Sequence, residues 1–406
     1  MKILSSPFTL PNGTVLNNRI AKSALSENIG TKKHAPSKTL INVYNEWAQG
    51  SPGLLITGNV MIDYKAIGEA RNVVVEDDRD MLLLKAWAAT VKDTGVELWP
   101  QINHPGRQAI GKINKEVVAP SAIPLQLKGV QGLFSTPRAL TEDEIMAIID
   151  RYGNTAQILK EAGFTGVQIH GAHGYLVSQF LSPISNQRTD QWGGRLENRV
   201  RFAIEVYRNI RKKVGPNYPV GIKINSADFQ RGGFTEEESL EVLQLLDKEG
   251  MDLLEISGGS YESPAMMGSN KKQSTIDREV YFMDYIKKAR KHTSKPLMLT
   301  GGFRTVSLME EALADDHLDI IGLGRPFCLY PHIANDIIHN GLTKIKTPTP
   351  VTGIKAIDAA GGLDVIWYAL QIKLIGEGKG PDPYLSGMTA FRKNLWVTLQ
   401  KAFFKN

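Results

Sequence analysis

We predict an α/β fold, a (β/α)8 barrel, for this chain of 406 residues. Eight short apolar segments alternate with eight longer stretches in which apolar residues recur at helical spacing. Glycine-rich turns follow the last two apolar segments, as in barrels that bind a phosphorylated ligand. A doubly wound open sheet is the alternative, and the lack of a G-x-G-x-x-G motif disfavours it.

The predicted strands and helices alternate regularly along the chain. Thr141 and Thr235 each stand three residues before a glutamate and fit capping boxes, and Gly163 and Gly250 follow predicted helix ends. The strands are Arg19–Ser23, Leu54–Gly58, Glu97–Ile102, Val167–His170, Val220–Asn225, Leu253–Ser257, Leu297–Thr300 and Ile320–Gly324. The helices lie near 37–49, 79–94, 142–162, 195–213, 236–249, 279–292, 305–315 and 331–339.

Three segments extend beyond this repeat. Residues 3–16 contain the turn signal Pro11-Asn-Gly13 and predict a short N-terminal hairpin at the barrel bottom. Residues 103–140 are too long for an ordinary strand-to-helix loop and predict an excursion over the active-site end. We expect residues 1–345 to form the barrel and 346–406 a C-terminal extension packed on the barrel or on a partner subunit.

Within the extension, residues 389–404 have apolar side chains four apart with basic residues between them. Such a basic amphipathic helix can lie on a membrane surface. Docking on the same protein or on a second subunit is the favoured interpretation, and it makes a homodimer through this segment an expectation.

Composition excludes several classes of protein. The single cysteine, Cys328, excludes a disulfide framework and a cysteine-ligated iron–sulfur cluster. A net charge of +6, spread along the chain, gives no basic stripe for nucleic acid. The sequence has no apolar run of the length of a membrane span and no signal-peptide pattern at residues 1–10, so we expect a cytoplasmic protein.

A polar group follows the fourth predicted strand, where His170, His173 and Tyr175 lie within six residues. Two imidazoles can donate hydrogen bonds to one electron-rich oxygen, and a nearby phenol can supply a proton. The set therefore suits a substrate with a polarised carbonyl. A structural pair or a metal site is an equal alternative on spacing alone, although a zinc site needs a third protein ligand.

Other strand ends also carry polar or small residues. Lys223 interrupts an apolar strand and needs an anionic group, and an ion pair with an acid on a neighbouring strand is the less favoured explanation. Gly58 removes a side chain where a flat ring can lie. The turns after the last two strands provide a candidate phosphate site, made of Gly301, Gly302, Gly324 and Arg325.

The run from His170 to Arg199 resembles the signature of the Old Yellow Enzyme family of FMN-dependent oxidoreductases. The resemblance extends from about residue 3 to about residue 340. It implies non-covalent FMN, NAD(P)H as reductant, and ping-pong hydride transfer to the C=C bond of an α,β-unsaturated carbonyl or related small molecule. His170 and His173 then bind the carbonyl oxygen, and Tyr175 protonates the α-carbon.

The resemblance also implies flavin contacts along three strands. Ser26 occupies a position where relatives have a flavin-tuning residue, Gln101 faces the pyrimidine edge of the flavin, and Lys223 faces its N1–O2 edge. The first strand adds Ser23, Ala24 and Leu25. Open alternatives are a flavin-dependent dehydrogenase or demethylase, a redox partner without small-molecule turnover, and a non-flavin barrel that binds a phosphorylated ligand or acts as a metal-dependent lyase.

Overall fold

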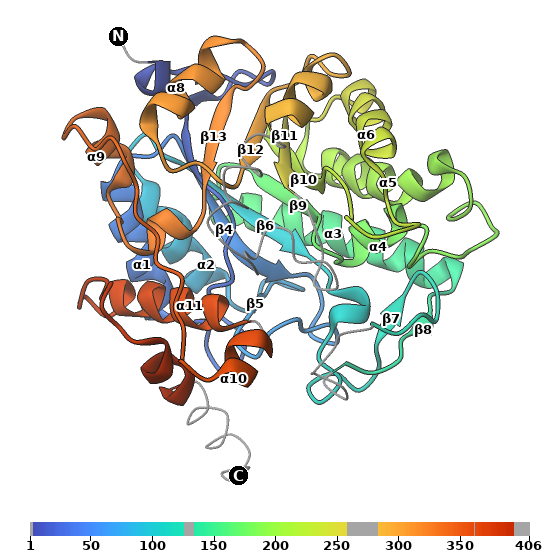
Figure 1. Ribbon diagram of the computed structural model, residues 1–406. Helices are drawn as coiled ribbons and strands as arrows, with labels where there is room; N and C mark the ends of the chain where they lie inside the picture. Colours follow the sequence, from blue (N-terminus) through green and yellow to red (C-terminus); the bar gives the residue numbers. More distant parts are fainter. Residues whose placement is uncertain (1–2, 126–133, 258–282, 361, 394–406) are drawn as a thin grey trace.

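The computed structural model describes residues 3–125, 134–257, 283–360 and 362–393, and it has a closed barrel of parallel strands (Figure 1). The strand order is β3-β13-β12-β11-β10-β9-β6-β4, and pairing of β3 with β4 closes the ring. All eight predicted strands are confirmed, at β3 (Ile20–Lys22), β4 (Leu54–Met61), β6 (Glu97–Asn103), β9 (Val167–Gly171), β10 (Val220–Asn225), β11 (Leu253–Ser257), β12 (Leu297–Thr300) and β13 (Ile320–Leu323).

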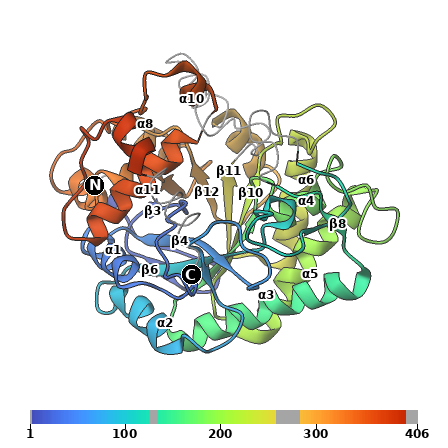
Figure 2. The same cartoon turned by 90° about the horizontal axis from the view of Figure 1, so that it is seen from below.

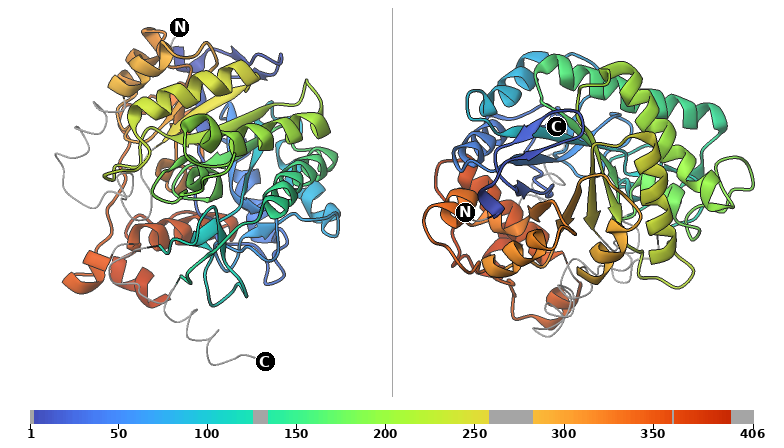
Figure 3. Two further views of the ribbon diagram at one scale, coloured as in Figure 1. Left: turned by 90° about the vertical axis from the view of Figure 1, so that its right-hand side faces the viewer. Right: turned by 90° about the horizontal axis from the view of Figure 1, so that it is seen from above.

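Helices surround the barrel, as the end-on views show (Figure 2 and the right panel of Figure 3). Both predicted capping boxes are present, and Gly163 and Gly250 adopt the left-handed conformation at the ends of their helices. Residues 283–290 are helical, but the start of the helix predicted at 279–292 lies outside the described residues. The other helices are α1 (Lys38–Gln49), α2 (Met81–Ala88), α3 (Glu142–Ala162), α5 (Leu196–Val214), α6 (Glu236–Glu249), α8 (Val306–Ala314) and α9 (Ile333–Ile338).

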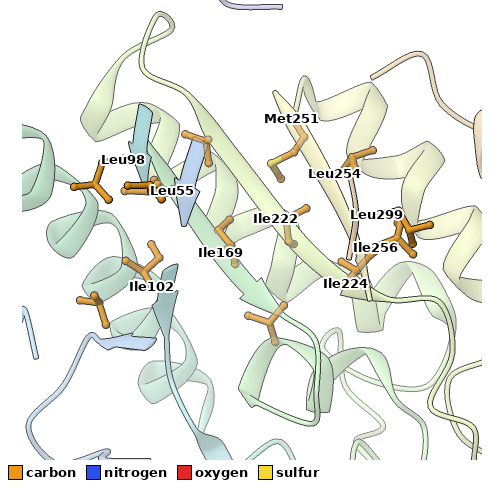
Figure 4. Close-up of a cluster of buried hydrophobic side chains, with 14 of the residues drawn as sticks. Leu55, Leu98, Ile102, Ile169, Ile222, Ile224, Met251, Leu254, Ile256 and Leu299 are labelled. Carbon is orange, nitrogen blue, oxygen red and sulfur yellow. The ribbon is translucent and has the colours of Figure 1, made fainter. Parts of the chain in front are cut away.

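The strands bury apolar side chains on both faces because the barrel has helices outside and a packed interior. Side chains such as Leu55, Ile169 and Ile222 point outward and pack beneath the helices (Figure 4). Trp99 and Met298 belong to a separate cluster that fills the N-terminal end of the barrel. Alternation along each strand thus fixes which residues face the interior.

The predicted N-terminal hairpin is confirmed and closes this end of the barrel. Its strands β1 (Phe8–Thr9) and β2 (Val15–Leu16) are antiparallel. Leu10 and Leu16 are buried in the same cluster as Trp99, Leu253 and Met298. The apolar hairpin therefore keeps water out of the interior from below.

The opposite end carries elements that the periodicity did not predict. The short strands β5 (Val73–Val74), β7 (Val118–Ala119) and β8 (Arg138–Ala139) lie in the long loops after β4 and β6. The helix α4 (Leu176–Leu181) follows β9, and its six residues are all buried. A six-residue helix whose polar residues, Ser178 and Gln179, are buried with the rest shows no amphipathic pattern, so sequence periodicity misses it.

The extension contains two helices that were not predicted, α10 (Lys355–Ala360) and α11 (Leu363–Gly376). The end of α11 lies against α1, where Asn42 Nδ2 donates to the Gly376 carbonyl at 3.0 Å. Residues 387–393 are helical, and the rest of the amphipathic stretch predicted at 389–404 lies outside the described residues. No helix in the described ranges is both long and apolar enough to cross a bilayer.

Candidate active site

A layer of polar side chains lies above the apolar interior, toward the C-terminal ends of the strands. Gln101 Nε2 donates to Gln168 Oε1 at 2.6 Å, and Gln168 Nε2 donates to Glu255 Oε2 at 2.6 Å. Thr300 Oγ1 donates to Glu255 Oε1 at 2.6 Å and also contacts Ser23 Oγ. Four of these residues come from four strands and Ser23 directly follows β3, so their hydrogen bonds fix the interior of the barrel mouth from side to side.

Lys223 is part of this layer through an ion pair, which was the less favoured interpretation of the sequence. Its Nζ lies 2.9 Å from Glu255 Oε1, and both side chains are almost fully buried. A buried ammonium needs such a partner, because desolvation without one is costly. Sequence reasoning missed Glu255, although it interrupts an apolar strand in the same way as Lys223. Parallel register places the two residues opposite each other.

His170 is buried beside Lys223 in the next strand. Its Nδ1 accepts a hydrogen bond from the Ala172 backbone N–H at 3.3 Å, so in the neutral ring the proton is on Nε2. Burial, with added repulsion from His173 and Lys223, lowers the pKa of His170 well below its usual value. No residue in the described part of the chain accepts from Nε2, so this N–H is available to a ligand.

His173 is held differently from His170, although their ring centroids are 5.2 Å apart. Its backbone is left-handed, with φ of 59°, which is unusual for a residue other than glycine. Asn225 Oδ1 accepts from its N–H at 3.1 Å, and Gln108 Nε2 donates to its carbonyl at 2.8 Å. Its Nε2 lies 2.7 Å from Ser257 Oγ. Burial and Lys223 lower the pKa of His173 to about 3.

Tyr175 completes the group expected after β9. Its ring centroid lies 4.7 Å from that of His170. Asn59 Nδ2 donates to its phenol oxygen at 3.4 Å. Asn59 reaches this position because the pairing of β4 with β6 shifts register between Ile56 and Asn59. The structure thus brings His170, His173 and Tyr175 together, and it adds Asn59, which sequence reasoning missed because a bulge has no periodic signal.

The segment after β3 contains the remaining flavin contacts expected on the first strand. Ser23 is buried, and Ala24, Leu25 and Ser26 are half-buried. Ser26 Oγ donates to the carboxylate of Glu69, a half-buried residue. Burial is the main cause that raises the pKa of Glu69. The Ser26 hydroxyl therefore already has an acceptor within the protein.

Gly58 is required for a different reason from the one expected. A Cβ there would lie 2.6 Å from the Leu25 carbonyl oxygen and 2.9 Å from the Glu27 carboxylate. The missing side chain makes room for the segment after β3, not for an open face on which a ring lies. Gly58 N–H also donates to Glu27 Oε1 at 3.0 Å, which ties β4 to that segment.

A buried ionic cluster supports this segment from outside the barrel wall. Glu27 lies 3.6 Å from Lys22 Nζ and accepts from the Tyr44 hydroxyl. Burial lowers the pKa of Lys22 and raises that of Glu27, while their mutual attraction opposes both shifts. The Lys22 ammonium also lies 4.5 Å from the centroid of the Trp47 ring. Sequence reasoning missed the cluster, because only the fold brings α1 to the end of β3.

The turns after β12 and β13 have the features of an anion site. Gly301 and Gly302 adopt φ of 129° and 82°, which favour glycine. The N–H groups of Gly302 and Gly324 donate to no acceptor among the described residues. Arg325, next to Gly324, is half-buried, and its Nη1 lies 3.3 Å from Asp364 Oδ2. Free N–H groups and one guanidinium fit a phosphate monoester.

A second group of donors fits the flavin ring of FMN. Gln101 and Lys223 offer an amide and an ammonium at the strand ends, which match the polar edge of the flavin ring. Metal chemistry has no comparable set, because the described ranges contain no cluster of three or more His, Cys, Asp or Glu side chains placed to hold a metal ion.

Comparisons with known proteins agree with this geometry. The model of the NADH:flavin oxidoreductase / NADH oxidase family matches residues 4–343. The chain is 33% identical to the NADH-dependent flavin oxidoreductase iccE of Talaromyces variabilis, over 92% of this chain and 98% of that protein.

Among solved structures, morphinone reductase superposes with a TM-score of 0.69 at 25% identity and covers 86% of this chain and 92% of its own. A 2-naphthoyl-CoA reductase complex gives a TM-score of 0.76 at 26% identity over 83% of this chain, which spans about half of that protein (52%). The chain therefore belongs to the NADH:flavin oxidoreductase / NADH oxidase family, as the Old Yellow Enzyme resemblance predicted, and is an oxidoreductase that uses FMN and NAD(P)H.

Proposed function

We propose that the protein reduces C=C bonds conjugated to a carbonyl or a similar electron-withdrawing group in small molecules. The observation that carries the proposal is the arrangement of His170 and Tyr175, a neutral imidazole with an available Nε2–H beside a phenol. The names of morphinone reductase and 2-naphthoyl-CoA reductase, both similar in structure, support reduction of an unsaturated organic substrate.

Binding of FMN assigns roles to the residues around the barrel mouth. Gly301, Gly302, Gly324 and Arg325 would hold its phosphate. Gln101 and Lys223 would face the polar edge of the ring, where the lysine would favour negative charge. The segment from Ser23 to Ser26 would lie along the ring, and Gly58 makes room for that segment. Bound FMN supplies the hydride for reduction of the substrate.

His170 donates from Nε2 to the carbonyl oxygen of the substrate, where negative charge develops during the reaction. A depressed pKa keeps this imidazole neutral, so that it donates without carrying its own charge. His173 lies beside it as the second expected donor, and Ser257 Oγ, 2.7 Å from its Nε2, orients the ring. Tyr175 delivers its phenol proton to the α-carbon, and Asn59 stabilises the phenolate that remains.

Replacement of Tyr175 by Phe tests the proton-transfer step. We expect Y175F to slow reduction of an enone such as cyclohexenone by about 100-fold or more, since a positioned general acid contributes on this order. Reduction of the bound flavin by NAD(P)H needs no such proton and keeps its rate. Anaerobic stopped-flow absorbance measures the two half-reactions separately.

Asn59→Ala serves as the control, because it removes the contact to the phenol and leaves the proton in place. It is expected to slow the enone step less than Y175F does. Loss of both half-reactions to the same extent in Y175F would remove Tyr175 as the proton donor. A protein that reduces its flavin with NAD(P)H but never returns electrons to an activated alkene would contradict the proposed substrate class.

A further inference from the structure

The C-terminal extension contacts the arginines that follow β12 and β13, although it lies outside the family match at 4–343. Arg304 Nε donates to Thr347 Oγ1 at 2.8 Å. Arg325 Nη1 lies 3.3 Å from Asp364 Oδ2, and the Arg325 guanidinium lies 5.8 Å from the centroid of the Tyr368 ring. A segment that is not part of the matched barrel therefore reaches both glycine turns.

Asp364 and Tyr368 are held in place by the packing of α11. Trp367, next to Tyr368, is buried. The Tyr368 hydroxyl donates to the Pro348 carbonyl at 2.6 Å. Asp364 lies in the first turn of α11, and the other end of the helix is fixed on α1 through Asn42. The carboxylate is thus carried by a supported helix, unlike the long arginine side chain that it contacts.

Arg325 keeps donors available after it binds Asp364. A guanidinium has five N–H groups, and only Nη1 of Arg325 has an acceptor among the described residues. Its Nε and its second terminal nitrogen remain available for an anion. Restricting a flexible arginine before the anion arrives lowers the conformational entropy lost on binding.

We propose that the C-terminal extension positions Arg325 for the phosphate of FMN, through the Asp364 carboxylate and the Tyr368 ring. The inference rests on the proposed assignment of the phosphate to the turns after β12 and β13. Asp364 also places a negative charge near the phosphate, which acts in the opposite direction. The guanidinium lies in direct contact with the carboxylate and neutralises much of that charge. The gain from positioning Arg325 therefore outweighs the repulsion, and the net effect of Asp364 is to strengthen FMN binding.

Flavin binding to the full-length apoprotein tests this, with FMN and riboflavin as ligands that differ by the phosphate alone. Quenching of flavin fluorescence gives both dissociation constants. We expect D364A to weaken FMN binding by about tenfold, the scale of one charge-assisted hydrogen bond, and to leave riboflavin binding within about twofold. Asp364→Asn keeps an acceptor without the charge and is expected to lose less. Glu377→Ala, which removes a carboxylate just beyond the other end of α11, is expected to change neither constant.

Three other binding results would contradict the proposed role of Asp364 or of the turns. Equal weakening of FMN and riboflavin by D364A would show that Asp364 supports the fold of the site and does not position Arg325 for phosphate. Unchanged or tighter FMN binding in both Asp364 variants would overturn the inference in the same way. If the unmodified protein binds FMN and riboflavin equally well, the phosphate assignment of the turns itself fails, which is a separate result.

Discussion

The two halves of the barrel mouth are built in different ways. In the half formed by β9, β10 and β11, the functional side chains project from strands and bond to one another. His170, Lys223 and Glu255 are nearly fully buried there. In the half formed by the ends of β12 and β13, the candidate groups are turn N–H groups and Arg325, which a helix from outside the barrel contacts.

This difference shows what each half needs from the rest of the chain. Strand register alone brings Lys223 opposite Glu255, and interior burial makes their pairing obligatory. No register relation brings Asp364 to Arg325, since the two residues are 39 positions apart and Asp364 lies in the helix α11, not in a barrel strand. We call the part formed by β9, β10 and β11 the strand half and the part formed by the ends of β12 and β13 the turn half. The geometry of the strand half is therefore expected to be fixed by the barrel itself, and that of the turn half to depend on the helix that contacts it.

Removal of the Glu255 charge is expected to give the largest effect, because it leaves the Lys223 ammonium buried without a counterion. We predict that Glu255→Gln lowers the free energy of unfolding of the apoprotein by about 3 to 5 kcal/mol, as for other broken buried ion pairs. Urea unfolding followed by circular dichroism measures it. Glu377→Gln, in a solvent-exposed ion pair with Lys379, is the matched control and is expected to change stability by less than about 1 kcal/mol.

Replacing Lys223 by Met together with Glu255→Gln then separates charge from packing. The double variant is expected to recover part of the lost stability, because no buried charge remains without a partner. A loss of less than about 1 kcal/mol in Glu255→Gln alone would mean that water reaches this layer, and the contrast between the two halves would disappear.

The fold was predictable because it depends on local patterns that repeat. The strands, the capping boxes at Thr141 and Thr235 and the N-terminal hairpin all follow from periodicity and turn chemistry within short windows. The helix α11 was missed because apolar residues occupy most of its positions, which hides any amphipathic face.

The site was predictable only where its residues lie next to one another in the sequence. His170, His173 and Tyr175 fall within one short stretch, and the structure brings their rings together. Glu255 and Asn59 were not foreseen, because their roles follow from which strands become neighbours and from a bulge in β4. Partners such as these belong to the assembled barrel and have no local signature.

Protonation of His173, in the strand half, is expected to change the stability of the protein by less than the removal of the Glu255 charge does. The pKa of His173 in the folded protein is about 3, below the unfolded value near 6.5. Below pH 6.5 the unfolded chain therefore binds a proton that the folded chain does not, and stability falls as the pH decreases toward 3. Asn tolerates the left-handed backbone at this position, so His173→Asn removes the titration with little strain.

We predict that the loss of stability on acidification from pH 6 to pH 4 is smaller in His173→Asn than in the unmodified protein, by about 1 kcal/mol per pH unit. Urea unfolding of the apoprotein at several pH values measures this slope. His339→Asn removes an exposed histidine just after α9, outside the barrel mouth, and is expected to leave the slope unchanged. Identical slopes in all three proteins would show that His173 is protonated in the folded state.

The smallest expected effect concerns the contact between Ser257 and His173, which orients one ring within the strand half. Ser257→Ala removes the oxygen that lies 2.7 Å from Nε2, so the ring can rotate and change tautomer. We expect an increase in KM for an enone of about fivefold, the scale of one neutral hydrogen bond, with a smaller change in kcat. Nitrogen-15 NMR of the imidazoles reports the tautomer directly, and Ser257→Thr, which retains a hydroxyl, is expected to keep both the KM and the spectrum.

An unchanged His173 signal in Ser257→Ala would mean that the left-handed backbone, held by Asn225 and Gln108, is enough to fix the ring. The strand half would then be rigid through its backbone as well as its side chains, and the contrast with the turn half would be greater than the one drawn from side chains alone.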